Sequence, residues 1–189
     1  MSDHMKRLAA PVAWPIKRKA AVWTTKPSPG AHSIESGMPA AMVLRDIIKV
    51  CDTAREAKRI IGNRELFVDG AAVKSPKAPI GLMDTVSVPK MKLNFRVLLT
   101  DKGKLTLVPI SEDEAKWKLC RIEGKTKIAG GKIQLNLSGG RNIVLDKNKY
   151  KTGDTLKINV EDQKIIDTYP IADGASALII YGALAGKVE

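Results

Sequence analysis

The residues whose types and spacing point most directly to chemistry are cations on a predicted helix. Arg55, Lys58 and Arg59 fall at positions i, i+3 and i+4, so they share one helix face, and no acidic residue interrupts them there. Guanidinium and ammonium groups held in this way bind phosphate oxygens. The alternative is a solvated surface, which is the usual place for charged side chains. We favour a phosphate-contacting face.

A second set of cations accompanies two tryptophans near the N-terminus. Residues 1–38 carry six basic and two acidic residues together with Trp14 and Trp23. Proline and glycine break any periodic pattern, so we expect an extended arm that is disordered by itself and has nothing nearby to bury the indoles. Phosphates would attract the charges, and unpaired bases would stack on the rings. A disordered tail with incidental charges is the alternative.

No catalytic or metal-binding set of residues is recognisable in the sequence. The only two histidines, His4 and His32, lie in the arm, which would not hold a general base in a fixed geometry. Cys51 and Cys120 lack metal-ligand spacing and are expected to pack in a core. The acidic run at residues 112–114 is explained by helix capping. We therefore predict no enzyme, no metal, no cofactor and no small-molecule substrate.

The charge of the whole chain favours a polyanionic partner. Its 189 residues include 32 Lys and Arg against 20 Asp and Glu, which gives a net charge of +12 and a pI near 9.7. A nucleic acid and an anionic membrane surface both fit. The apolar runs are far shorter than the roughly 20 residues of a membrane span, and basic residues interrupt the N-terminus where a signal peptide would be apolar. We expect a cytoplasmic protein without membrane contact.

Residues 39–90 are predicted to form two short helices followed by a small sheet. Pro39 can open the first helix. Thr53 and Glu56 form a capping box that begins the second helix, and the Asp-Gly dipeptide at 69–70 predicts a two-residue hairpin. The apolar positions expected on the buried faces are Leu44, Ile47, Ile48, Cys51, Ala57, Ile60, Ile61, Val86 and Val88.

Residues 91–175 are predicted to be mainly β-structure. Ser111 and Glu114 form a further capping box, and Trp117 after it is expected in a core rather than as a platform for a ligand. Several short strands separated by turn residues suggest a small barrel or a curled sheet. The alternating apolar residues are Leu105, Leu107, Ile133, Leu135, Leu137, Leu156, Ile158 and Val160.

Several motifs resemble the archaeal and eukaryotic small-subunit ribosomal protein S-four-e family. Residues 4–11, His-Met-Lys-Arg-Leu-Ala-Ala-Pro, followed by Trp14, are similar to the start of these proteins. Residues 27–32 resemble a second signature of the arm, with Ala31 where proline is common. The resemblance covers nearly the whole chain in order and with similar spacing. Further matching segments are Leu-Arg-Asp at 44–46, Gly-Leu-Met-Asp at 81–84 and residues 113–120.

The resemblance implies an α+β fold in several parts. A basic, Pro-rich extended arm would occupy residues 1–38, an S-four-type RNA-binding domain of two helices and a sheet residues 39–90, and a central β domain residues 91–175. Residues 176–189 would begin a strand at 178–181 and then open a KOW-type module. Because these residues do not complete the motif, a closed KOW-type barrel is not expected from them.

The implied function is that of a structural constituent of the small ribosomal subunit. Its partners would be small-subunit rRNA and neighbouring ribosomal proteins, on ribosomes in the cytoplasm. An RNA-modifying enzyme or an accessory RNA-binding regulator carrying an S-four-type domain are the alternatives. The candidate RNA contacts are Lys6, Arg7, Trp14, Lys17, Arg18, Lys19, Trp23, Lys26, His32, Arg45, Lys49, Arg55, Lys58, Arg59, Arg64 and Lys74.

Overall fold

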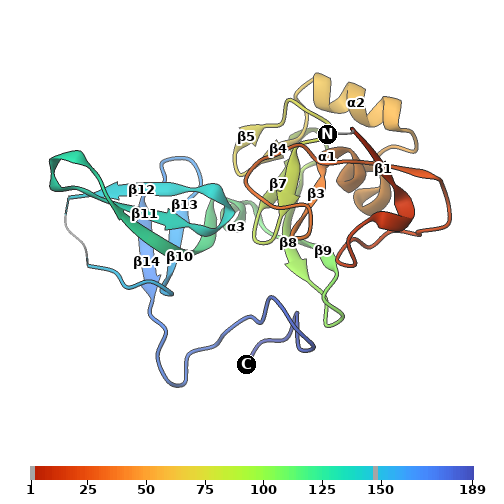
Figure 1. Cartoon of the computed structure of the whole chain (residues 1–189). Helices are drawn as coiled ribbons and strands as arrows, with labels where there is room; N and C mark the ends of the chain where they lie inside the picture. The colour runs from red at the N-terminus through yellow and green to blue at the C-terminus, as the bar shows by residue number, and fades with distance from the viewer. Residues whose placement is uncertain (1–2, 147–148) are drawn as a thin grey trace.

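Two five-stranded antiparallel sheets organise the computed structural model within the part of the chain that it describes, residues 3–146 and 149–189 (Figure 1). The first sheet has the order β5-β4-β7-β8-β9 and the second the order β12-β11-β10-β13-β14. Short helices accompany the first sheet, so the predicted α+β class is confirmed. Among the described residues, no helix is long and apolar enough to cross a membrane.

The first sheet contains the predicted hairpin. Asp69 and Gly70 join β4 to β5 with φ angles of 48° and 72°, and a type I′ turn requires positive φ at both of these positions. The strands are β4 (Phe67–Val68), β5 (Ala71–Ala72), β7 (Thr85–Val88), β8 (Leu93–Leu99) and β9 (Leu105–Pro109). A separate two-stranded sheet pairs β3 (Gly37–Pro39) with β6 (Pro79–Gly81).

Two helical segments lie beside this sheet. The first begins as α1 (Ala40–Met42), continues as the π-helix η2 (Val43–Ile48) and stops at Lys49, which adopts a left-handed conformation. The second, α2 (Ala54–Gly62), begins at the predicted capping box. Thr53 Oγ1 accepts from the Glu56 amide at 3.2 Å, and the Glu56 carboxylate accepts from the Thr53 amide at 3.3 Å.

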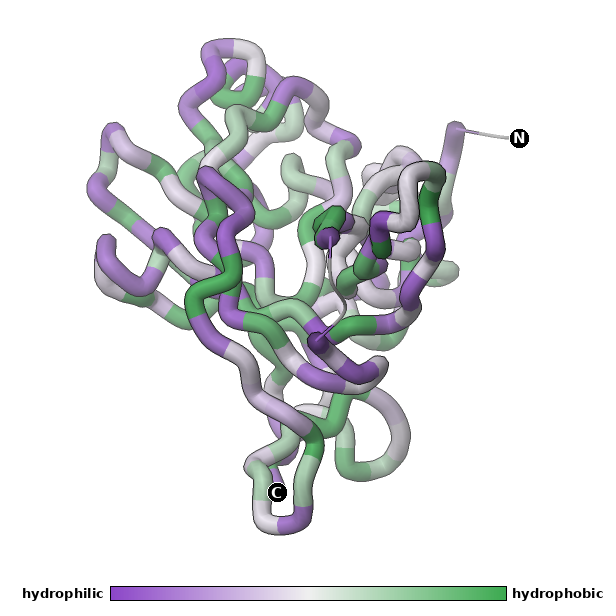
Figure 2. Tube along the Cα trace, turned by 90° about the vertical axis from the view of Figure 1, so that its left-hand side faces the viewer, coloured by the Kyte–Doolittle hydropathy of each residue, from purple (hydrophilic) through white to green (hydrophobic). Residues whose placement is uncertain are grey.

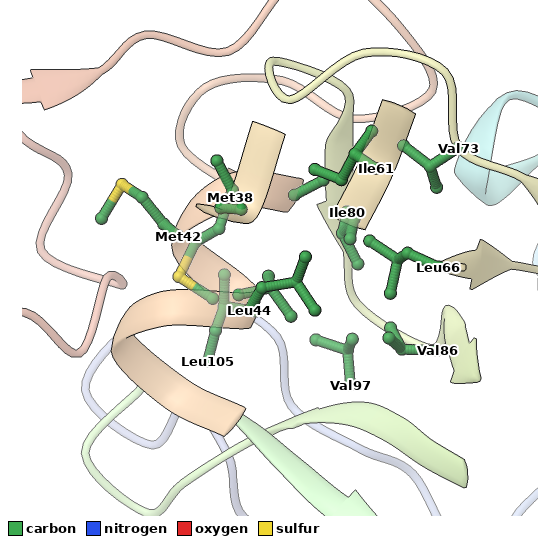
Figure 3. Packing of buried hydrophobic residues seen from close by; sticks show 14 of the residues in the cluster. Met38, Met42, Leu44, Ile61, Leu66, Val73, Ile80, Val86, Val97 and Leu105 are labelled. Atoms are coloured by element: carbon green, nitrogen blue, oxygen red, sulfur yellow. The ribbon is translucent and has the colours of Figure 1, made fainter. Parts of the chain in front are cut away.

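The helices and the first sheet share one core. Ile61 of α2 and Leu44 of η2 are 1% and 0% exposed, and both belong to the same cluster as Val86 and Val97 of the sheet. In Figure 3 Ile61 lies beside Val73 and Ile80. Burying an aliphatic side chain of this size stabilises the fold by about 1.5–3 kcal/mol. Cys51 is buried here, as its spacing predicted.

The domain boundary expected after residue 90 falls inside the first sheet. The short 3-10 turn η3 (Pro89–Met91) connects β7 to β8, and β8 and β9 then complete the sheet. Val97 and Leu105 belong to the first core, so by packing the first unit continues to the end of β9. The sequence does not show where the first unit ends, because short strands with alternating apolar residues are predicted on both sides of residue 90.

The second unit is a curled sheet around β10. The helix α3 (Glu112–Ala115) begins at the predicted Ser111 capping box and leads into β10. The first half of β10 pairs with β13 and its second half with β11, with a register shift between Ile122 and Gly124. The elements are β10 (Trp117–Lys127), η4 (Ala129–Gly131), β11 (Ile133–Leu137), η5 (Ser138–Gly140), β12 (Asn142–Leu145), β13 (Thr155–Asn159) and β14 (Ile165–Tyr169). Its core comprises Cys120, Ile122, Leu135, Leu137, Leu156 and Ile158.

The N-terminal arm is folded against the first unit, which corrects the expectation of a disordered segment. Strand β1 (His4–Lys6) pairs with β2 (Trp23–Thr25), and the 3-10 turn η1 (Arg7–Ala9) follows β1. Trp14 is 1% exposed, joins the first core and donates from Nε1 to the Gly37 carbonyl at 2.9 Å. The indole is buried by residues distant in sequence, which a search for nearby partners could not find.

Residues 170–189 lie beyond both sheets at one end of the molecule in both views (Figures 1 and 2). The strand predicted at 178–181 is reduced to a bridge between Leu178 and Val188 inside a small hairpin. Gly186 lies against the loop between β8 and β9, where a side chain would collide with the Thr100 carbonyl. The opening of a KOW-type module in this segment stays a prediction.

Candidate nucleic-acid interface

The exposed side of α2 carries the cations that the sequence singled out. Because Ala57 and Ile61 pack into the core, Arg55, Lys58 and Arg59 project to solvent. None of these three cations forms an ion pair with any residue that the structure describes. We call Arg55, Lys58 and Arg59 the helical surface. Because no carboxylate among the described residues pairs with these cations, they remain available to an external anion.

Two further candidate cations lie just outside the ends of α2. Lys49 precedes the helix and Arg64 follows it; both are exposed and both have positive φ, at 60° and 57°. Lys74, beyond β5, is also exposed. Within the described parts of the chain, these three side chains form no ion pair with a carboxylate. They extend the positive charge of the first unit without belonging to its internal contacts.

Arg45 differs because its charge is already compensated. Its Nη2 lies 2.8 Å from Asp46 Oδ2, and its side chain is 22% exposed. The same carboxylate lies 3.8 Å from Arg7 of the arm. Asp46 therefore connects the arm to η2, and Arg45 is half-buried in that connection.

Three of the candidate residues in the arm build the arm itself. Arg7 is buried and donates from Nε to the Lys17 carbonyl at 2.6 Å. Arg18 donates to the carbonyls of Leu8, Ala10 and Pro11 at 2.7–3.1 Å. Trp14 is buried as described above. In this conformation the buried side chains of Arg7 and Trp14 are inaccessible to RNA, and Arg18 is occupied by backbone oxygens.

The remaining arm residues form an exposed aromatic and basic patch. Trp23 is 55% exposed and faces Lys6 across the β1–β2 pair. The His4 ring lies 5.6 Å from the indole at an interplanar angle of 57°. Lys17 and Lys19 are exposed in the loop between the two strands, whereas Lys26 is half-buried after β2. We call Lys6, Lys17, Lys19 and Trp23 the arm surface.

His32 belongs to a buried ionic cluster rather than to the surface. The cluster comprises His32, Asp69, Asp84, Lys118 and Arg141 and joins the arm, the first unit and the second unit. His32 Nε2 lies 2.9 and 3.0 Å from the two carboxylate oxygens of Asp84. Lys118, 1% exposed, lies 2.5 Å from Asp84 and 2.8 Å from Asp69.

Arg141 completes the cluster from the second unit. Its Nη2 lies 3.2 Å from Asp69, and its Nη1 donates to the Val160 carbonyl at 3.3 Å. Two glycines make room for these side chains. A side chain at Gly81 would collide with the His32 ring, and one at Gly139 would crowd Lys118 Nζ. The cluster therefore leaves no room for a side chain at Gly81.

The charges around Asp84 and Lys118 favour the ionised forms of these two side chains. Burial alone would raise the pKa of Asp84, but the hydrogen bond from His32 and the charge of Lys118 outweigh it, so the pKa lies below its ordinary value. Burial would lower the pKa of Lys118, but the charges of Asp84 and Asp69 raise it overall. Breaking such a cluster by removing one partner leaves an uncompensated buried charge.

A second contact between the units centres on Trp117. Arg96 of β8 stacks on this ring with its Cζ 4.0 Å from the ring centroid, and Lys157 Nζ lies 4.4 Å from it. Arg96 also donates to the carbonyls of Glu114 and Trp117 at 2.7 and 2.8 Å. Trp117 is half-buried and already contacts two cations of the protein. The sequence indicated an apolar residue here but gave no sign of these two cations.

The described residues show no set of side chains suited to catalysis by thiol or metal. Burial raises the pKa of Cys120 to about 11, and it also raises the pKa of Cys51. Both thiols are therefore protonated and buried. Within residues 3–146 and 149–189, no three His, Cys, Asp or Glu side chains are grouped so that they could hold a metal ion.

Comparisons with known proteins identify two matching family models. Residues 91–165 match the model described as Ribosomal family S4e, and residues 1–35 match the RS4NT (NUC023) domain. The chain is 49% identical to small ribosomal subunit protein eS4 of Methanosphaera stadtmanae, over 98% of this chain and 78% of that protein. It is 44% identical to the eS4 protein of Methanothermobacter thermautotrophicus, over 98% of this chain and 76% of that protein.

A solved structure shares the fold. The crystal structure of 30S ribosomal protein S4e from Thermoplasma acidophilum is 31% identical to this chain and superposes with a TM-score of 0.71. The match covers 81% of this chain and 79% of that one. The overall fold of this chain is therefore also found in an experimentally determined relative.

Proposed function

The chain belongs to the ribosomal S4e family, and from that premise we propose that it is a structural component of the small ribosomal subunit that binds rRNA. The observation that carries this proposal is the helical surface, three exposed cations on α2 without a carboxylate partner among the described residues. Such cations neutralise phosphates and release the counterions bound to RNA. Neighbouring ribosomal proteins would be the further partners, on ribosomes in the cytoplasm.

The arm surface adds a contact of a different kind. The exposed indole of Trp23 offers a face on which an unpaired base can stack, and Lys6 lies opposite it in the strand pair. Stacking of this kind favours single-stranded loops and bulges over regular helices. The proposed target is therefore folded rRNA in which a phosphate-rich groove lies near an unpaired segment.

The proposal is tested by binding of the full chain to in vitro transcribed small-subunit rRNA over a salt series. A plot of log affinity against log salt should have a steep negative slope, with each neutralised phosphate contributing roughly 0.7–0.9. Replacing Arg55, Lys58 and Arg59 together with alanine should reduce that slope by about 2–3 while leaving the folded structure intact. Binding that is indifferent to salt would overturn the proposal.

Association with the ribosome needs a separate measurement. The native protein should co-sediment with small subunits at moderate salt if it is a constituent of them. A protein that stays at the top of the gradient while still binding RNA in vitro would instead act away from the ribosome. The same incubation, followed by mass analysis of the RNA, tests for any modification of the nucleotides.

A further inference from the structure

A second region of exposed positive charge begins at the tip of the second sheet. The register places Lys127 opposite Ile133, where β10 turns into β11, so its exposed side chain lies at the tip of this hairpin. The turn contains Gly130 and Gly131 at φ angles of 83° and 74°, and an added Cβ at either would meet no atom within 4 Å. The tip therefore projects into open solvent.

Further exposed cations lie in the segment that precedes β13. Lys149 and Lys151 are exposed in the segment that precedes β13, and Lys125 Nζ donates to the Tyr150 carbonyl, which holds that segment against β10. Among the described residues, Lys127, Lys149 and Lys151 form no ion pair. We call these three residues the hairpin surface. Lys132 nearby is paired with Asp146 at 3.3 Å and is not included.

The hairpin surface and the helical surface lie on different units of the molecule. In Figure 1 the β10–β11 turn lies at the left-hand end of the second unit, and α2 lies along the top of the first unit. Figure 2 looks onto the hairpin end. Strand β10 runs from Trp117 to Lys127, and at about 3.3 Å per residue it spans roughly 30 Å. Cations this far apart contact different parts of one RNA.

The ionic cluster fixes the distance between the two surfaces. Lys118 lies at the start of β10 and is held by Asp69 and Asp84 of the first unit, while Lys127 lies at the end of the same strand. Arg96 and Trp117 add a second contact between the units beside the cluster. The strand that carries the hairpin is thus anchored at its base by buried ion pairs.

We propose that the hairpin surface is a second RNA-binding site, and that the protein bridges two separate rRNA segments at a separation fixed by the ionic cluster. The proposal rests on the proposed function. RNA is favoured over an acidic protein segment because the three lysines are exposed and form no ion pair among the described residues, and Ile128, 37% exposed, is the apolar residue of the tip. Two linked sites also reinforce each other, because the second contact becomes intramolecular.

The test is hydroxyl-radical footprinting of small-subunit rRNA with three full-length proteins. These are the wild type, a helical variant (Arg55→Ala, Lys58→Ala and Arg59→Ala) and a hairpin variant (Lys127→Ala, Lys149→Ala and Lys151→Ala). Each variant removes three positive charges, so each serves as the matched control for the other. We expect each variant to lose protection of a different RNA segment, with an affinity loss of at least roughly hundredfold.

The outcomes separate the two proposals. If the wild type binds rRNA and the hairpin variant leaves every protected segment unchanged, the bridging proposal is overturned while the proposed function stands. The hairpin variant could instead give the wild-type footprint on naked rRNA but fail to enter assembled subunits. The hairpin would then contact another protein, and the bridging proposal would again be overturned. A wild type that protects no segment contradicts the proposed function itself.

The fixed separation is tested with Arg141→Gln, which removes the ion pair between the second unit and Asp69 of the first unit and leaves both surfaces intact. A bridge of fixed length predicts that both segments stay protected while the affinity falls towards that of the hairpin variant. An affinity equal to that of the wild type, in a variant whose near-ultraviolet circular dichroism shows it to be folded, would exclude the cluster as the element that sets the separation.

Discussion

The ionic cluster and the helical surface contain the same kinds of side chain in opposite circumstances. Lys118 is 1% exposed and contacts two carboxylates, whereas Lys58 is exposed and has no ion-pair partner among the described residues. The first lysine connects two units of the fold, and the second is left for a partner outside it. The count of 32 lysines and arginines therefore overstates how many are available for RNA, because some of them form ion pairs inside the protein.

Asp84→Asn is expected to cause the largest loss of folding stability, and it tests whether the buried ionic cluster stabilises the fold. Asp84 contacts both His32 and Lys118, so its neutralisation leaves Lys118 buried with one carboxylate fewer. Removing one partner from a buried ion pair typically costs about 3–5 kcal/mol. Denaturant unfolding should show a loss of that order. Asp113→Asn is the control, because this carboxylate is 90% exposed and pairs with Lys116 at the surface; a similar loss there would contradict the distinction.

The two arm tryptophans provide the next comparison. Trp14→Ala should lower the unfolding free energy by about 3–5 kcal/mol, because it empties a buried site in the core. Trp23→Ala should leave stability nearly unchanged, because the indole is largely exposed, but weaken rRNA binding by about 1–3 kcal/mol if a base stacks on it. Thermal melts and binding isotherms on both variants test this; equal effects on stability would break the comparison.

The stability of the cluster should depend on pH at both extremes. Folding lowers the pKa of Asp84. Its contribution to the free energy of unfolding is therefore fully present above the ordinary pKa of 3.8 and is lost as the pH falls through the lower pKa of the folded state. The pKa of Lys118 is raised, so its contribution is present below 10.5 and is lost as the pH rises through the higher folded value. Unfolding measured from pH 2 to 11 should therefore show a plateau between these limits.

The Asp84→Asn variant is the control for the acid side of this profile. It lacks the titrating carboxylate and should lose less stability than the wild type on acidification. If the wild type and the variant lose stability in parallel below pH 4, other carboxylates dominate acid unfolding. The assigned role of Asp84 would then be wrong.

Local signals predicted much of this fold because they act between residues close in sequence. The capping boxes at Thr53 and Ser111 both form with the predicted partners, and the Asp-Gly dipeptide at 69–70 forms the predicted turn. The apolar spacing that placed Ile61 and Leu135 in cores is likewise confirmed. In each case the physical determinant lies within a few residues of the position predicted.

Which charged side chains are buried or paired inside the protein could not be predicted in the same way. His32 and Asp84 are 52 residues apart in sequence, and Lys118 and Asp69 are 49 apart, so no spacing rule connects them. Trp14 likewise finds its hydrogen-bond acceptor 23 residues away. The prediction that the arm is basic, Trp-bearing and unfolded therefore missed that its own Arg7 and Arg18 bind backbone carbonyls and fold it.

The most direct test compares two variants with the same change in net charge. The helical variant removes Arg55, Lys58 and Arg59, while a paired variant replaces Lys90, Lys116 and Lys164, which lie 2.5–3.4 Å from Glu65, Asp113 and Asp162 respectively. We predict that the slope of log affinity for small-subunit rRNA against log salt falls by about 2–3 in the helical variant and by less than about 1 in the paired variant. Equal changes in the two slopes would show that net charge alone governs binding and would contradict the account.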